Sequence, residues 1–172
     1  IGKEVSQFFR VVRLRLDRGA DDAVRAGTPV LSSEGLVGQV QRVVGRYSDV
    51  TLAADPESRV DVVVMRTGAR GIVRGTGETT RYACLLEYLG GAGQTQVGDD
   101  LYTSGYGQRF PQGILVGRVT KVVSRERGRT QDVEVTPAVD FGRLEHVLLL
   151  TEGPREPRGE APAGAERAAG SP

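Results

Sequence analysis

A nine-residue segment that occurs twice constrains the fold of this chain more than any other feature. Residues 36–44 read LVGQVQRVV and residues 115–123 read LVGRVTKVV, so six of the nine positions are identical. Shorter matches surround this segment in the same order along the chain, and they pair residues 27–33 with 98–104, 49–52 with 132–135, Asp55 with Asp140, and 59–61 with 143–145. Repetition of several blocks in one order indicates that a single structural unit has been duplicated.

The spacing of apolar residues predicts strands along most of the chain. Val12, Leu14 and Leu16 alternate with charged residues, which is the period-two pattern of a half-buried strand. Further short strands are expected at residues 30–31, 35–44, 49–53, 59–65 and 71–74. No window supplies the helices that an α/β fold needs between its strands. The chain is therefore predicted to be all-β, and its short, regularly spaced strands favour a sandwich or a barrel.

Gly38 and Gly117 occupy the same place in the two copies of the repeat. Glycine weakens a strand unless the chain bends there or another backbone comes close, and small barrels need such bends to close. We therefore predict two small tandem β-barrels, one over residues 1–75 and one over residues 76–150, with exchange of strands between them possible. Residues 151–172 are rich in proline, glycine, alanine and charge, and this composition predicts a disordered tail.

Charge and cysteine content exclude several classes of function. The 23 basic and 22 acidic side chains nearly balance, so no nucleic-acid partner is predicted. The single cysteine, Cys84, and the single histidine, His146, exclude a disulfide framework and a structural zinc site, and no metal or cofactor is predicted. No apolar run approaches the roughly 20 residues that span a bilayer. Because the chain begins with Ile, any membrane anchor is expected to lie outside this sequence, in a longer protein.

Ser104, in the sequence TSGYG, is the best candidate for a nucleophile, because two small barrels also form the chymotrypsin-like proteases. A catalytic serine needs a base and an orienting acid beside it. His146 lies downstream of Ser104, whereas those proteases place their histidine upstream, and TSG is not a G-x-S-x-G elbow. No catalytic residue is therefore predicted, and a degenerate or active serine hydrolase using Ser104 is the alternative function. The pairs Asp21–Asp22 and Asp99–Asp100 are expected to cap turns rather than to bind calcium.

An aromatic loop precedes the second copy of the repeat. The corresponding link before the first copy, residues 33–35, is eight residues shorter. Aromatic loops on a rigid scaffold commonly acquire binding roles, so we predict a partner-binding site made of Tyr102, Tyr106, Phe110, Pro111 and Ile114. Phe110 could instead close the open end of the second barrel, and the two roles are compatible. The predicted structural glycines are Gly38, Gly105, Gly113 and Gly117.

Five runs of residues resemble the bacterial rod shape-determining family MreC, and together they extend over about residues 1–150. The runs are GLVGQV at 35–40, SDVTLAAD at 48–55, RTGARGIVRG at 66–75, VGDDLYTSGYGQRFPQGILVGRV at 97–119 and VTPAVDFGRLEHVLLL at 135–150. The resemblance implies an extracytoplasmic region of two small β-barrels, separated here from the transmembrane helix and the coiled coil that precede it in the family. This expectation agrees with the duplication read from the sequence itself.

The same resemblance implies a function without catalysis. The family is a scaffold of the cell-wall elongation machinery that maintains rod shape by binding and activating a peptidoglycan synthase. The implied partners are the elongation-specific penicillin-binding transpeptidase, MreD, MreB and RodZ, together with further copies of the protein itself. The implied location is the extracytoplasmic face of the inner membrane, in the periplasm, with contact to the membrane only through the anchor of the longer protein.

Overall fold

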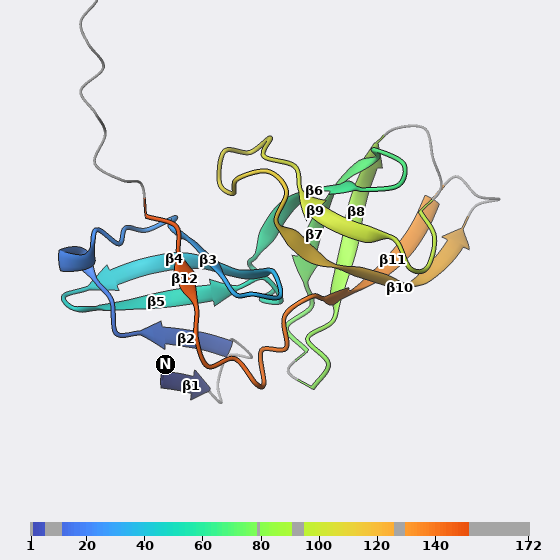
Figure 1. The fold of residues 1–172 in the computed structure, drawn as a ribbon. Coiled ribbons are helices and arrows are strands. Elements are labelled where there is room, and N and C mark those ends of the chain that lie inside the picture. Colours follow the sequence, from blue (N-terminus) through green and yellow to red (C-terminus); the bar gives the residue numbers. More distant parts are fainter. Residues whose placement is uncertain (1, 6–11, 79, 91–94, 126–129, 152–172) are drawn as a thin grey trace, which may run out of the picture.

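The computed structural model describes residues 2–5, 12–78, 80–90, 95–125 and 130–151, and within these residues the fold is all-β (Figure 1). The strands form two groups. One is a six-stranded sheet with the order β1-β2-β5-β4-β3-β12, and the other is a closed barrel with the order β10-β11-β8-β7-β6-β9. The predicted disordered tail lies outside the described residues, apart from its first residue, Thr151.

Most strands lie where the sequence pattern predicts them, but the strands Gly2–Val5 and Cys84–Gly90 were not predicted. The strand bounds are β1 Gly2–Val5, β2 Val12–Leu16, β3 Pro29–Leu31, β4 Leu36–Val44, β5 Tyr47–Leu52, β6 Arg59–Val64, β7 Arg70–Gly75, β8 Cys84–Gly90, β9 Asp100–Thr103, β10 Leu115–Arg125, β11 Thr130–Pro137 and β12 Leu148–Leu149. A short 3-10 turn, Ala20–Asp22, precedes β3. In β6, Val60, Val62 and Val64 are fully buried while the residues between them are partly exposed, as the period-two pattern predicts.

The prediction of two closed barrels is wrong for the first group of strands. In the second group β6 and β7 pair through five residue positions and close the barrel. The corresponding end strands of the first group, β12 and β1, are not paired with each other in the described structure. Since β12 is only two residues long, it can extend the sheet beside β3 but is too short to close it.

The two groups nevertheless share one order of strands and the same registers. In the first, Val30 lies opposite Gly38 and the register then shifts at Leu36; in the second, Leu101 lies opposite Gly117 and the register shifts at Leu115. A second irregularity follows in each long strand, between Val40 and Arg42 in β4 and between Val119 and Lys121 in β10. Bulges of this kind increase the local twist of a strand, so the repeated segment bends at matching places in both groups.

Gly38 and Gly117 allow a close approach between neighbouring strands. A Cβ atom on Gly38 would lie 2.0 Å from the carbonyl oxygen of Thr51, and one on Gly117 would lie 2.4 Å from the carbonyl oxygen of Thr136. Both positions therefore exclude any side chain, and the two glycines make the same contact in the two groups.

One of the sequence matches is displaced by two residues. The registers place Val50 and Val135 at the same position, each opposite the fifth residue of the repeated segment, so residues 49–52 correspond to 134–137 rather than to 132–135. A shift by two residues keeps every side chain on the same face of a strand, which is why the apolar pattern could not distinguish the two alignments. With the observed register, the ion pairs Arg42–Asp49 and Lys121–Glu134 correspond to each other.

The predicted boundary at residue 75 does not separate the two groups of strands. β6 and β7 precede this boundary but belong to the closed barrel, whereas β12 follows it but pairs with β3 of the first sheet. In Figure 1, β12 accordingly lies beside the blue and cyan strands of the N-terminal half. Similar turns precede β6 and β12, at the two places where the chain passes from one group of strands to the other. A side-chain oxygen of Asp55 accepts the N–H of Glu57 (2.8 Å), and one of Asp140 accepts the N–H of Gly142 (2.9 Å).

A continuous apolar core connects the two groups. Ala54 of the first contacts Gly75 of the second so closely that a Cβ on Gly75 would lie 2.0 Å from the carbonyl carbon of Ala54. Cys84 is buried in this core, as expected for a small apolar side chain, and burial raises the pKa of its thiol to about 12. The cysteine therefore stays protonated at neutral pH and packs as a structural residue.

Candidate functional site

The long loop between β9 and β10, residues 104–114, is fastened at both ends to Thr103. The Thr103 hydroxyl donates to the carbonyl oxygen of Pro111 (2.5 Å) and accepts the N–H of Ile114 (2.9 Å). The backbone adds two more bonds, since the N–H of Thr103 donates to Ile114 O (2.8 Å) and the N–H of Gly113 donates to Thr103 O (2.9 Å). Thr103 is fully buried, so the base of the loop is held by satisfied polar contacts inside the barrel.

Ser104 forms part of the turn that begins this loop. Its hydroxyl accepts the N–H of Tyr106 (3.2 Å), and its own N–H donates to the carbonyl oxygen of Asp61 (2.9 Å). Gly105 then adopts a φ of +73°, which favours glycine. No hydrogen bond joins Ser104 to His146 in the described part of the chain, so the geometry supplies no base for a nucleophilic serine.

The five predicted binding residues lie in one region but differ in exposure. Tyr106 is 77% exposed, and the guanidinium carbon of Arg70 lies 5.2 Å from the centroid of its ring. Phe110 is only 7% exposed and belongs to the core. Tyr102 and Ile114 are half-buried, and Pro111 is exposed. Tyr106 and Pro111 are therefore accessible from solvent, while Phe110 holds the loop against the body of the protein.

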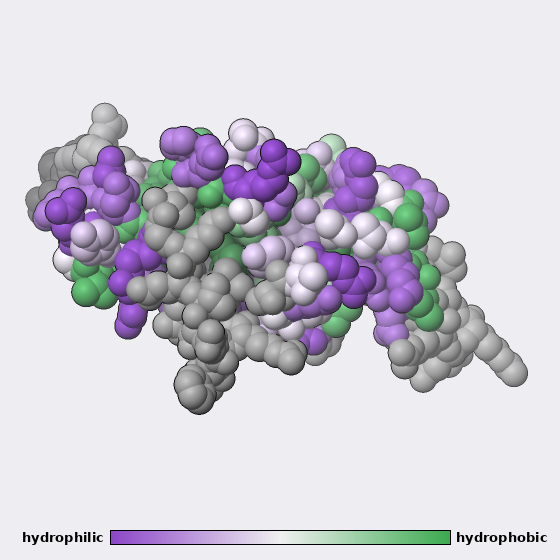
Figure 2. Space-filling view, turned by 90° about the horizontal axis from the view of Figure 1, so that it is seen from below, coloured by the Kyte–Doolittle hydropathy of each residue, from purple (hydrophilic) through white to green (hydrophobic). Residues whose placement is uncertain are grey.

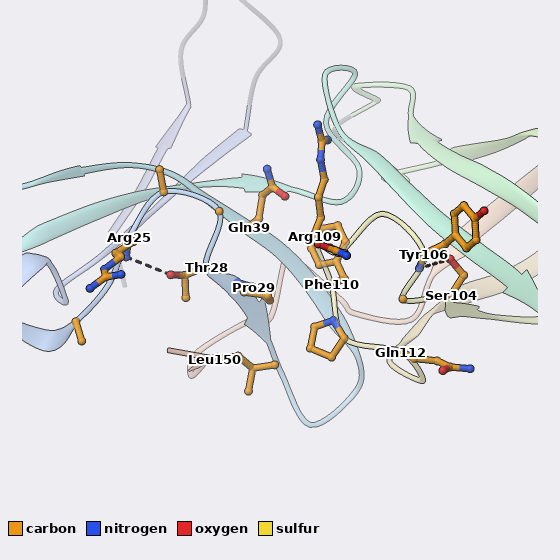
Figure 3. Close-up of a pocket in the computed structure, with 16 residues that line it drawn as sticks. Arg25, Thr28, Pro29, Gln39, Ser104, Tyr106, Arg109, Phe110, Gln112 and Leu150 are labelled. Atoms are coloured by element: carbon orange, nitrogen blue, oxygen red, sulfur yellow. Dashed lines mark hydrogen bonds between the residues drawn. The ribbon is translucent and has the colours of Figure 1, made fainter. Parts of the chain in front are cut away.

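A groove of about 930 Å³ separates this loop from the first sheet (Figure 3). One wall is the loop, and the other is the turn that leads into β3 together with Gln39 of β4 and Leu150. Figure 3 shows Arg25 and Thr28 on the side of the first sheet, and Arg109 and Phe110 on the loop. The complete lining comprises Ala23, residues 25–29, Gln39, residues 104–106, residues 108–112 and Leu150.

Sequence patterns identified only one wall of this groove. The loop was recognisable because it is long and aromatic, whereas no sequence feature indicated a binding role for Arg25, Gln39 or Leu150. Leu150 reaches the groove because the N–H of Leu150 donates to the carbonyl oxygen of Pro29 (3.0 Å), next to the pairing of β12 with β3. The pairing of β12 with β3 brings Leu150 to the first sheet, and no local signal in the sequence indicates that pairing.

Three of the four paired aspartates, Asp22, Asp99 and Asp100, make structural contacts. Asp99 is buried, and its carboxylate accepts two hydrogen bonds from Arg66 (2.7 and 2.9 Å), which hold its pKa below the ordinary value. Asp100 pairs with Arg118 (2.7 Å), and Asp22 accepts the N–H of Gly19 (3.0 Å). Among the described residues no group of three or more His, Cys, Asp or Glu side chains is arranged to hold a metal ion.

Among the coloured residues of Figure 2, hydrophilic side chains lie over much of the surface, and hydrophobic ones form smaller groups between them. None of the helices in the described residues has the length and apolarity needed to cross a membrane. The exposed apolar side chains are likewise distributed, with Tyr106 on the loop and Met65 and Val97 at the far end of β6 and β9.

A family model described as rod shape-determining protein MreC, barrel core, matches residues 1–151. The chain belongs to the MreC family. It is 36% identical over 135 residues to the cell shape-determining protein MreC of Escherichia coli, an alignment that covers 78% of this chain. The chain spans only 36% of the length of that MreC protein.

Solved MreC structures have the same fold. The crystal structure of MreC from Pseudomonas aeruginosa is 35% identical, covers 87% of this chain and 94% of its own, and has a TM-score of 0.78. A second similar structure is a complex between the penicillin-binding protein PBP2 and MreC from Helicobacter pylori, with a TM-score of 0.58, 17% identity, and coverage of 84% of this chain and 89% of that one. At that identity the likeness establishes the fold alone.

Membership of MreC also decides between the two predicted classes of function. The family consists of shape-determining structural proteins, so the chain is not an enzyme, and the alternative of a serine hydrolase using Ser104 is wrong. The missing base agrees with this conclusion, because Ser104 is engaged in the turn of the loop.

Proposed function

We propose that this chain is the partner-binding part of a non-enzymatic scaffold that maintains rod shape by binding and activating a peptidoglycan synthase. The loop with Tyr106 and Pro111 carries the proposal, because it is the enlarged segment of one unit and is held rigidly by Thr103. Exposed tyrosine on a rigid element suits an interface, since an aromatic side chain buries much area at a small entropic cost. The complex of a relative with PBP2 indicates a penicillin-binding transpeptidase as the partner.

Replacing Tyr106 by alanine tests this role. The variant is expected to weaken binding of the purified synthase by about tenfold, a typical effect of truncating an aromatic interface residue, while its melting temperature stays close to that of the parent. The small effect on stability follows from the 77% exposure of Tyr106. Titration calorimetry with the extracytoplasmic region of the synthase measures the affinity.

Tyr47→Ala is the matched control. Tyr47 is also exposed and also lies beneath an arginine, with Arg46 5.4 Å from its ring centroid, but it belongs to the β4–β5 hairpin of the first sheet. Equal losses of affinity in the two variants, or no loss in Tyr106→Ala, would contradict a role for the loop. Phe110→Ala is a poorer probe, because removal of this buried ring is expected to destabilise the fold by about 3 kcal/mol.

Further partners and the location of the protein follow from the family. We expect the scaffold to work on the extracytoplasmic face of the inner membrane with MreD, MreB and RodZ, and to self-associate. The support is the rod shape-determining description of the family and a structural relative that is named as a periplasmic domain. The synthase contact is assigned to the loop, which leaves the β4–β5 hairpin and the open edge of the first sheet available for other copies.

The two groups of strands suggest a duplicated unit that exchanged its last strand. The unit would comprise β1 to β6 in one copy and β7 to β12 in the other, since each strand pairing of the first sheet has a counterpart six places away in the barrel, and only the pairing of β6 with β7 has none. Matching backbone bonds support this origin: Met65 N–H donates to Asp100 O (3.0 Å) as Leu150 N–H donates to Pro29 O (3.0 Å). Each sixth strand completes the other copy's sheet, so the two halves would form one body that holds the loop and the groove in fixed positions.

A further inference from the structure

Two arginines in the groove lack the ion-pair partners that several other arginines of the described residues possess. Arg15, Arg66 and Arg118 lie 2.7–2.8 Å from the carboxylates of Asp49, Asp99 and Asp100. Within the described ranges neither Arg25 nor Arg109 has a carboxylate within ion-pair distance, and both are exposed. Two unpaired guanidinium groups in one groove therefore offer a surface for an anionic ligand.

The remaining residues that line the groove also favour an anionic, peptide-like ligand. Among the described residues, no aspartate or glutamate lines the groove, whereas three glutamines, Gln39, Gln108 and Gln112, do. A primary amide both donates and accepts hydrogen bonds, so it matches the alternating N–H and C=O groups of an extended backbone. Phe110 and Pro111 add apolar surface on the loop side. The groove thus combines positive charge, amide groups and an apolar wall.

We propose that this groove binds an extended acidic segment of the synthase, with Arg25 and Arg109 each pairing with one of its carboxylates. This inference rests on the proposed function, which names the synthase as partner. Figure 3 places Arg25 on the wall formed by the first sheet and Arg109 on the loop, so the segment would need acidic residues separated along its length. A guanidinium group binds a carboxylate through two parallel hydrogen bonds, which makes arginine specific as well as attractive here.

The size of the groove fits a chain segment. Its volume of about 930 Å³ lies near the upper end of the range of ligand pockets. Because the two walls come from different groups of strands, an occupant would contact both at once. Binding is therefore expected to raise the melting temperature of the chain, in addition to forming ion pairs with the two arginines.

The test uses a fluorescently labelled peptide of alternating glutamate and serine, and the same peptide with lysine in place of glutamate. The parent chain is expected to bind the glutamate peptide and not the lysine peptide. Arg25→Ala and Arg109→Ala are each expected to weaken binding about threefold, and the double variant about tenfold, as for exposed charge pairs that add independently. Arg143→Ala is the matched control, since it removes an exposed arginine outside the groove and is expected to leave binding unchanged.

Equal affinity for the two peptides, or unchanged binding by the double variant, would overturn the inference. Binding of the synthase to the parent and to the double variant distinguishes failure of this inference from failure of the proposed function. If the synthase binds the parent and the double variant equally well, the groove is not its site although the scaffold role stands. If the synthase binds neither protein while the glutamate peptide binds the parent, the proposed function fails, and with it the assignment of the segment to the synthase.

Discussion

Asp49 shows how this chain places a buried carboxylate in an all-β core. Its side chain is 7% exposed and accepts hydrogen bonds from Arg15 (2.8 Å) and Arg42 (2.6 Å), which come from the two strands on either side of β5. The hydrogen bond from Arg15 is the largest cause that holds the pKa of this carboxyl below its ordinary value of 3.8, against the opposing effect of burial. Asp49 therefore stabilises the folded chain in its charged form.

The pH dependence of stability follows from this lowered pKa. The contribution of Asp49 is complete above the unfolded value, near pH 4, and is lost as the pH falls through the folded pKa, because the unfolded chain then binds the proton more readily. Asp49→Asn is expected to lower the free energy of unfolding at pH 7 by about 1–2 kcal/mol, allowing for the half-exposed arginines. It is also expected to make the loss of stability below about pH 4 less steep than in the parent.

Urea unfolding across this pH range measures both effects. Asp21→Asn serves as the control, because Asp21 is exposed in the turn before β3 and is expected to change neither quantity. A parent and an Asp49→Asn variant with parallel pH profiles would show that the carboxylate does not contribute in its charged form.

At the scale of single strands, the sequence predicts much of the fold because burial leaves a period-two pattern. Val60, Val62 and Val64 alternate as a strand must, and the repeated segment is recognisable wherever it occurs. The same pattern says nothing about neighbours in space. It could not reveal that β12 joins β3, nor distinguish two alignments of β11 that differ by two residues, because both keep the same side chains inside.

The placement of β6 in the barrel and of β12 in the first sheet predicts how the chain behaves when it is divided. A cut between Thr67 and Gly68 separates β1 to β6 from β7 to β12. Each fragment then lacks one strand of its sheet, and the second fragment also loses the buried Val60, Val62 and Val64. We expect each fragment alone to be poorly folded and an equimolar mixture to form a one-to-one complex with the spectrum of the parent. NMR spectra and size-exclusion chromatography measure this outcome, and two fragments that fold separately without associating would contradict it.

At the scale of the whole molecule, β12 connects the two halves that form the groove, because it follows the barrel strands in the sequence but pairs with β3 of the first sheet. The loop wall could be predicted from its length and aromatic residues, but the opposite wall consists of Arg25, Gln39 and Leu150, which lie far apart in the sequence and show no common pattern. A candidate surface lined by both groups of strands cannot be predicted from single segments of the sequence. The enlarged loop between β9 and β10 extends from the barrel toward the first sheet (Figure 1), and it therefore forms one wall of the groove.

The scaffold role is tested most directly by crosslinking in living cells. A photoreactive amino acid at position 106 or 109 lies on the loop, whereas position 47 lies on the hairpin of the first sheet. We predict that the probes on the loop crosslink to the penicillin-binding transpeptidase and that the probe at position 47 does not. Crosslinking to the transpeptidase from position 47 alone, with none from positions 106 and 109, would contradict the assignment of the loop as the synthase-binding surface.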